Sequence, residues 1–331
     1  MVTDRFKPRT ERFDGAQRGQ MLLIGALLIA VTIVALALVI NTVLYTANIG
    51  SGQEANQINE VNEFTHEVSR NARSLMLRAN HVERNRSIAD LQTDVNHSIV
   101  GYSSGLARSF AIEGTVYTNV SYRGAAETGT RIVQSRDRNF SEPGDPTDGN
   151  WEVVPGPTGT AVGWFLLNVN VQDTSTVNTT ISVDDGSNRL TYTINQSDNT
   201  NVSVVVEDRT GAVLDETTCR SVGGRTLLDL YGGSSPTGEC TFTGIETNLG
   251  PSTVEIDNGT EITGQYAIVT NRTWSTSWSM PWGAYDACKT DPLAQTCITP
   301  AVWKGVVDLT YRSDGVQLGQ QRNVSVYGGS S

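Results

Sequence analysis

The chain has little of the side-chain chemistry that enzymes commonly use. Its only histidines, His66, His81 and His97, fall within a stretch of helical pattern, and the strand-rich remainder has none. That remainder therefore cannot form a Ser-His-Asp or Cys-His catalytic group, or a zinc site that contains histidine. The three histidines are too far apart in sequence to act as ligands on adjacent helical turns. We interpret each as an ordinary surface or packing residue.

Positive charge is scarce as well. Lysine occurs only at Lys7, Lys289 and Lys304, and the formal net charge at pH 7 is −11. A surface that follows a phosphate backbone needs clustered lysine and arginine side chains, which this composition does not supply after the first 18 residues. We therefore expect no nucleic-acid partner, and no docking of the acidic part of the chain on anionic lipid.

Charge is absent altogether between Arg18 and Glu54, and Met21–Ile40 is apolar except for Gly25 and Thr32. A helix rises about 1.5 Å per residue, so a run of this length covers a hydrocarbon core of about 30 Å. A buried core helix is the alternative, but helices of soluble proteins keep a polar face and this run has none. The run is predicted to be a transmembrane helix.

Basic residues crowd the segment before this run, whereas the first arginine after it is Arg70. Positive charge stays on the cytoplasmic side, so we expect a cytoplasmic N-terminus and an exported chain after residue 41. A removable secretory signal is the competing interpretation, but its apolar region is shorter and ends in a small-residue cleavage site. The predicted location is a single pass through the cell membrane with an extracellular C-terminal domain, and the lipid bilayer is then one partner.

All four cysteines lie in the exported region, and no two of them are spaced as a redox or zinc pair. An oxidising environment lets disulfides persist, and four cysteines allow three pairings. Two separate clusters and the entropy of loop closure favour Cys219–Cys240 and Cys288–Cys297.

Two helices are expected after the span. Apolar or small residues recur in steps of three and four from Ile58 to Val82, which is a heptad seam that requires a partner helix. Ser87-Ile88-Ala89-Asp90 has the pattern of a capping box, and helical spacing continues to Phe110. A corner at residues 84–87 would make an antiparallel hairpin, and one long rod that pairs with a neighbouring subunit is the alternative.

From Gly114 onward the period changes to two and β-branched residues predominate, which predicts strands. Because turn residues, not helical crossovers, separate them, a mainly antiparallel sandwich is favoured. The expected strands are 115–117, 130–133, 164–171, 190–194, 202–206, 226–230, 262–270, 306–311 and 320–326, with turns at 184–186 and 313–315. The proline-containing segment 137–160 is expected to be a long exposed loop.

The predicted fold class is therefore α+β, in four segments. These are a basic cytoplasmic leader (1–19), a transmembrane helix (20–48), a helical hairpin stalk (49–112) and an extracellular β-sandwich-like domain (113–331).

Three carboxylate pairs are candidates for the acid and base of a glycosidase or for calcium ligands: Asp184–Asp185, Glu207–Asp208 and Asp215–Glu216. Each is near a residue that favours turns, and none has the spacing of a calcium loop. We interpret them as solvated turns, and so predict no catalytic residue, no metal ligand and no cofactor.

Two further surface features stand out. An aromatic group formed by Trp274, Trp278, Trp282 and Tyr285 could form a contact surface for sugar or protein, but we favour inward packing of these side chains. Asn-X-Ser/Thr sequons, all beyond the apolar run, are candidate glycosylation sites. They are Asn85, Asn96, Asn119, Asn139, Asn178, Asn195, Asn201, Asn258, Asn271 and Asn323.

The junction Arg18-Gly19-Gln20-Met21, followed by Leu22-Leu23-Ile24-Gly25, resembles the leader of archaeal type IV pilin-like proteins and archaellins. In those proteins a prepilin peptidase cuts after the glycine of an Arg-Gly pair, which implies processing between Gly19 and Gln20. Ile24 departs from the glutamate that many bacterial pilins have at the fifth mature position.

The wider pattern resembles a family of uncharacterised haloarchaeal single-pass membrane proteins. It comprises Asn41, Tyr45, Tyr102, Leu106 and the segment 129–132. The prediction that follows is a non-enzymatic, membrane-anchored cell-surface protein, either pilin-like or an envelope component, which meets similar proteins through its helical segment. The alternative is an extracellular carbohydrate-binding module or a carboxylate-dependent envelope hydrolase.

Overall fold

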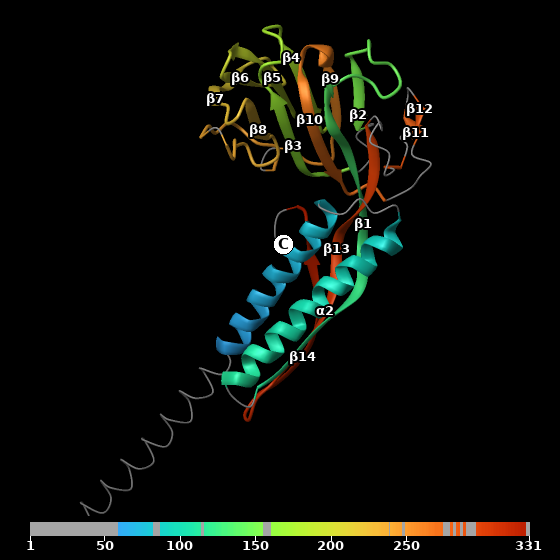
Figure 1. The fold of residues 1–331 in the computed structure, drawn as a ribbon, viewed down its shortest axis with the longest axis vertical. Coiled ribbons are helices and arrows are strands. Elements are labelled where there is room, and N and C mark those ends of the chain that lie inside the picture. The colour runs from blue at the N-terminus through green and yellow to red at the C-terminus, as the bar shows by residue number, and fades with distance from the viewer. Residues whose placement is uncertain are drawn as a thin grey trace, which may run out of the picture. The chain divides into compact units, whose positions relative to one another are not determined.

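A computed structural model describes residues 59–81, 87–113, 116–154, 160–237, 239–246, 249–273, 279–280, 283–284, 287–288 and 296–328. The chain from Phe64 onward forms one compact unit, and only residues 59–63 of the preceding unit are described. This part of the chain is α+β: two helices accompany mainly antiparallel sheets (Figure 1).

None of the helices that the structure describes is long and apolar enough to cross a membrane. The predicted span at Met21–Ile40 and the leader at 1–19 lie outside the described residues. The transmembrane helix therefore stays a prediction from sequence.

Helix 59–81 and α2 (Ile88–Glu113) pack antiparallel (Figure 1). The rings of Phe64 and Phe110 lie 6.0 Å apart, and Asn71 Nδ2 donates to the Tyr102 hydroxyl at 3.1 Å, so partner numbers fall along one helix as they rise along the other. Ser87 accepts a hydrogen bond from the Asp90 N–H, as the capping pattern predicts. The two predicted helices and their antiparallel packing are confirmed, which excludes the single rod, and residues 84–86 of the predicted corner lie outside the described residues.

The described residues after α2 form two six-stranded sheets and one short hairpin. The strands are β1 (Tyr117–Asn139), β2 (Trp151–Val154), β3 (Val162–Asn170), β4 (Thr179–Asp184), β5 (Arg189–Asp198), β6 (Asn201–Asp208), β7 (Val213–Arg220), β8 (Arg225–Asp229), β9 (Thr253–Asp257), β10 (Thr263–Thr270), β11 (Ser279–Met280), β12 (Gly283–Ala284), β13 (Cys297–Arg312) and β14 (Gln317–Ser325). The first sheet has the order β14-β13-β1-β10-β3-β8 and the second β2-β9-β4-β5-β6-β7, while β11 pairs with β12.

The two large sheets bury their facing side chains in one core, which makes a β-sandwich-like domain. Phe165 and Leu167 of β3 belong to the same buried cluster as Tyr192 and Ile194 of β5. The alternation of buried and more accessible positions along β5 is what period-two patterning requires of a strand with one face on the core. The sandwich prediction is confirmed at this level.

The strands β1 and β13 extend beyond the sandwich (Figure 1). The half of β1 that pairs with β10 begins at Thr130, whereas residues 117–128 pair with β13 alone. Helix 59–81 and α2 lie along this extension, with Gly305 of β13 placed directly beneath Met76, where an added Cβ would lie 2.3 Å from the sulfur. We call residues 117–128, 304–312 and 317–325, with the two helices, the helix-covered extension.

The prediction of a long exposed loop at 137–160 is wrong in part. β1 runs to Asn139, β2 occupies Trp151–Val154, and Phe140 is fully buried with its carbonyl oxygen accepting from Trp151 Nε1 at 2.8 Å. Pro143 and Pro146 lie in turns, and the buried residues Phe140 and Trp151 on either side of them return the chain to the core. The predicted turns at 184–186 and 313–315 are confirmed as connections of β4 to β5 and of β13 to β14.

Candidate functional site

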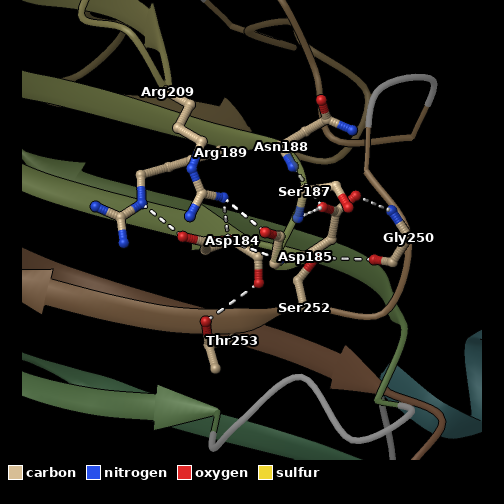
Figure 2. Close-up of polar contacts among 10 residues, drawn as sticks. Asp184, Asp185, Ser187, Asn188, Arg189, Arg209, Gly250, Ser252 and Thr253 are labelled. Atoms are coloured by element: carbon tan, nitrogen blue, oxygen red, sulfur yellow. Dashed lines mark hydrogen bonds and ion pairs between the residues drawn. The ribbon is translucent and has the colours of Figure 1, made fainter.

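The Asp184–Asp185 pair is engaged in structural hydrogen bonds (Figure 2). Asp184 accepts from the Gly186 N–H at 2.7 Å and from Arg189 Nε at 2.8 Å, and Arg209 Nη1 lies 3.3 Å away. Burial alone would raise the pKa of Asp184, but these hydrogen bonds and the two guanidinium charges outweigh it and lower the pKa. A general acid needs a raised pKa, so Asp184 is suited to anchoring the β4–β5 turn and not to donating protons.

Asp185 has a similar role. Its Oδ1 accepts from the backbone of Ser187 and Asn188 at 2.8 and 2.6 Å, and its Oδ2 accepts from the Gly250 N–H at 3.2 Å (Figure 2). Hydrogen bonds from Asn188 and Gly250 lower the pKa of Asp185. The carboxylate joins the β4–β5 turn to the segment that precedes β9.

The other two pairs lie on neighbouring strands, where Val206 of β6 is paired with Asp215 of β7. Asp208 caps the β6–β7 turn by accepting from Thr210 Oγ1 at 2.6 Å and from the Ala212 N–H at 3.0 Å. The hydrogen bond from Thr210 is the main cause of the lowered pKa of Asp208. The prediction of a turn at Asp215–Glu216 is wrong, because both residues lie within β7. Asp215 accepts from Thr243 and Glu216 is exposed. Hydrogen bonds lower the pKa values of Asp184, Asp185 and Asp208, which suits turn-anchoring carboxylates and not the general acid of a glycosidase.

The histidines are not grouped. His66 and His97 are exposed, whereas His81 packs edge-on against Trp164 with ring centroids 4.0 Å apart, and its Nε2 lies 2.9 Å from the Tyr327 hydroxyl. Burial, helped by the charge of Arg131, lowers the pKa of His81 from 6.5 to about 3. His81 is therefore neutral near pH 7. No group of three or more metal-ligating side chains exists in the described part of the chain.

A groove begins beside this contact. It is a cavity of about 300 Å³ on the face of the first sheet that points away from the sandwich core, and four strands, β1, β10, β3 and β8, form its floor. Its lining includes Arg131, Trp164, Leu166, Asn168, Leu227 and Gln265. Asn168 Oδ1 is buried there, and no donor among the described residues reaches it.

The groove is the best candidate site because it combines the surfaces that a polar ring-shaped ligand requires. An aromatic face and aliphatic floor pack against the ligand, while a few amide and guanidinium groups fix its orientation. Sequence reasoning missed it. The signal was Trp164-Phe165-Leu166-Leu167, where four consecutive apolar residues give β3 two apolar faces and not one.

Both predicted disulfides are present. Cys219 of β7 is bonded to Cys240, and Cys288 is bonded to Cys297 at the start of β13. The first joins an edge of the second sheet to the segment between β8 and β9. The aromatic group at Trp274, Trp278, Trp282 and Tyr285 lies outside the residues whose side chains are described, so its orientation stays untested.

The sequons differ in accessibility, apart from Asn85, which lies outside the described residues. Asn195 and Asn201 are half-buried, and their amide nitrogens donate to Asn178 Oδ1 at 2.7 Å and to Asp198 Oδ2 at 2.6 Å. Asn271 is also half-buried. The exposed sequon asparagines are Asn96, Asn119, Asn139, Asn178, Asn258 and Asn323. Glycosylation at each remains a prediction.

Comparison with known proteins identifies a family match over part of the chain. Residues 15–148 are similar to DUF7261, described as a family of unknown function. The matched range contains the predicted apolar run, both described helices and β1, and it ends before β2. No curated protein and no solved structure matches the chain.

Proposed function

We propose that this chain is a non-enzymatic cell-surface protein, anchored by one transmembrane helix and acting as a pilin-like or envelope component. The observation that carries this proposal is the uncharged run Met21–Ile40 behind a basic flank, because it favours export of everything that follows. Two disulfides in the exported part support the same location, since disulfides persist outside the cytoplasm.

Topology is tested by adding protease to intact cells. We expect removal of the sandwich and protection of a fragment that contains residues 1–19, while a cytoplasmic marker stays intact. A sandwich that becomes accessible only after lysis contradicts the proposal.

The pilin-like part of the proposal rests on processing between Gly19 and Gln20. The intact mass of protein isolated from its native membrane should lack residues 1–19, and Gly19→Val, which places a branched side chain at the cut, should retain them. Retention in the native protein reduces the proposal to a plain membrane anchor.

A second candidate, a carbohydrate-binding module, is favoured by the groove. Trp164 supplies an aromatic surface there, Asn168 and Gln265 supply amides, and Arg131 supplies a positive charge suited to acidic sugars. The test compares retention of the protein on neutral and uronic-acid-containing polysaccharides. Asn168→Ala and Gln265→Ala should lower retention, whereas Thr193→Ala, on the other sheet, should not.

A further inference from the structure

One sequon lies where β1 ends and the chain leaves the first sheet. Asn139 is the last residue of β1, and Ser141 follows it after Phe140. Phe140 is fully buried, its ring packs against Tyr266 with centroids 5.0 Å apart, and its N–H donates to the Gly259 carbonyl at 2.8 Å. Asn139 is exposed and Ser141 is half-buried. Both polar side chains of the sequon therefore lie on the outer side of the chain, and Phe140 fixes their position.

The amide of Asn139 is held in one orientation. Its Oδ1 accepts from Thr263 Oγ1 at 2.9 Å, across a register pair of β1 and β10. Its Nδ2 donates to no described residue, whereas the Nδ2 atoms of Asn195, Asn201 and Asn258 all donate hydrogen bonds. Asn139 thus presents the nitrogen that N-glycosylation uses from a side chain whose oxygen is already bonded.

Asn139 and Ser141 line a cavity of about 300 Å³. Pro143 and Pro146 give its wall an apolar surface, and Arg138 and Glu142 bring charged groups to it. Neither charged side chain forms a hydrogen bond or ion pair with a described residue. Apolar surface beside available polar groups is the combination that a sugar ring uses, and the volume is at the lower end of the range for ligand pockets, roughly 300–1,000 Å³.

The part of the wall at residues 142–148 is a closed turn. Glu142 N–H donates to the Asp148 carbonyl at 2.9 Å, and Asp148 N–H donates to the Asp145 carbonyl at 3.2 Å. Thr147 N–H donates to Asp145 Oδ1 at 2.9 Å. A ligand in the cavity does not have to order this turn, so little of its binding free energy is lost to conformational entropy.

We propose that Asn139 is N-glycosylated and that the first sugar of its glycan occupies this cavity. The inference rests on the proposed export of the sandwich, because a glycan of this kind is added to exported chains. The position of the sequon favours an attached sugar over a free one. A ring bonded to the cavity wall has a high effective concentration there, so weak contacts with Arg138, Glu142 and the two prolines suffice to hold it.

The covalent step needs a donor saccharide whose anomeric carbon is esterified to a lipid-linked phosphate, and a transferase of the host. Asn139 Nδ2 forms a bond to the anomeric carbon as the bond from that carbon to the phosphate oxygen breaks. The electron pair of the broken bond leaves with the phosphate, and a base of the transferase takes one Nδ2 proton. Ser141 supplies the hydroxyl that the acceptor motif requires.

Peptide mapping by mass spectrometry of the full chain from its native membrane tests the modification. The peptide that contains Asn139 should carry the mass of a saccharide. Asn139→Gln and Ser141→Ala should each abolish it, and Ser141→Thr, which keeps the hydroxyl, should retain it. An unmodified Asn139 in a chain whose sandwich is cleaved on intact cells overturns this inference alone. An unmodified Asn139 in a chain whose sandwich is protected overturns the proposed export as well.

Hydrogen exchange tests whether the sugar lies in the cavity. The amides of Glu142 and Asp148 should exchange roughly tenfold more slowly in the modified chain than in Asn139→Gln. Arg138→Ala leaves the sequon intact, so the peptide should still carry the saccharide, but most of this difference should disappear. Asn323→Gln, at an exposed sequon on β14, is the matched control and should leave exchange in the turn unchanged.

Two outcomes of this measurement overturn the position of the sugar. Equal exchange in the modified chain and in Asn139→Gln would mean that the glycan extends into solvent. Faster exchange caused by Arg138→Ala in the Asn139→Gln background would mean that Arg138 stabilises the turn itself and does not act through the sugar.

Discussion

The sandwich and the helix-covered extension use the same two long strands but are stabilised in different ways. In the sandwich, strands from both sheets bury alternate aliphatic and aromatic side chains, and both disulfides have their cysteines in or next to its strands. In the extension, one layer of β1, β13 and β14 is covered by two helices, and the described helices contain no cysteine.

Polar contacts and a close approach, in place of cross-links, hold the first helix on or next to the strands of the first sheet. Asn80 forms two hydrogen bonds with the backbone of Val302, donating at 2.9 Å and accepting at 2.8 Å, and Arg73 Nε donates to the Val326 carbonyl at 3.1 Å. Gly305 lets Met76 approach the sheet. A strand can therefore pass from one layered arrangement to another if its alternation of buried and exposed side chains continues. The layer that covers the strand in each region then needs separate contacts to hold it in place.

The largest expected effect tests whether the two regions unfold together. Phe165 is fully buried in the sandwich, and Phe165→Ala should reduce the free energy of unfolding by about 4 kcal/mol. Met76→Ala in the extension should cost about 3 kcal/mol. Because β1 and β13 run through both regions, we expect each variant to shift one common transition in chemical denaturation. Val177→Ala, at a residue 52% exposed, is the control and should change little.

The disulfides provide the next comparison, because the extension has no counterpart among its described residues. Cys219 and Cys240 are 21 positions apart, and removing both sulfurs by alanine substitution should cost about 3 kcal/mol through the entropy of the unfolded chain. Cys288 and Cys297 are 9 apart, and the same change there should cost about 2.5 kcal/mol. Denaturation midpoints at constant slope measure both, and a larger loss for the shorter loop would contradict this order.

The hydrogen bonds between Asn80 and Val302 fix the first helix to β13, and their loss should have a smaller effect than loss of a disulfide. Asn80→Ala leaves the buried N–H and carbonyl of Val302 without these partners, which should cost about 2 kcal/mol. Asn71→Ala is a matched control on the same helix, since it removes only a partly buried bond to Tyr102 and should cost about 1 kcal/mol or less. Equal losses at the two positions would mean that the contact with β13 is not what fixes this helix.

Local signals in the sequence predicted the elements with strong periodicity. The capping box at Ser87, the helical spacing of α2 and the alternation in β3, β5 and β6 each arise from residues within one element, so no long-range information was needed. β4, β7 and β9 were missed because they are short and rich in threonine or acidic residues. Their strand character comes from pairing with neighbours, which a single sequence does not display.

The candidate groove depends on contacts that are distant in sequence. Asn80 and Val302 are 222 positions apart, and His81 is brought to Trp164 only when helix 59–81 meets the first sheet. Nothing near His81 in sequence distinguishes it from the exposed His66, so its burial could not be predicted. The two apolar faces of β3 were visible, but which residues complete the groove depends on strand order.

The smallest expected effect is a dependence of stability on pH that originates at the boundary between the two regions. The pKa of His81 falls from 6.5 to about 3 on folding, so the unfolded chain binds a proton there at a higher pH than the folded chain does. Stability from this group is fully present above pH 6.5 and is lost as the pH falls toward 3. Between pH 7 and pH 5 the loss should be about 1 kcal/mol, after allowance for partial access of solvent.

His81→Phe should flatten that slope, because phenylalanine retains a ring against Trp164 but binds no proton. The range from pH 7 to pH 5 excludes effects of the anchoring carboxylates Asp184, Asp185 and Asp208. Their pKa values are lowered, so their contribution to stability is lost only at more acidic pH. Denaturation at pH 7, 6 and 5 measures the slope, with His97→Gln on the exposed face of α2 as the matched control. If the dependence of stability on pH persists in His81→Phe and disappears in His97→Gln, the group responsible lies away from the boundary. The contact of His81 with Trp164 and Tyr327 would then be a packing contact that does not contribute to the dependence of stability on pH.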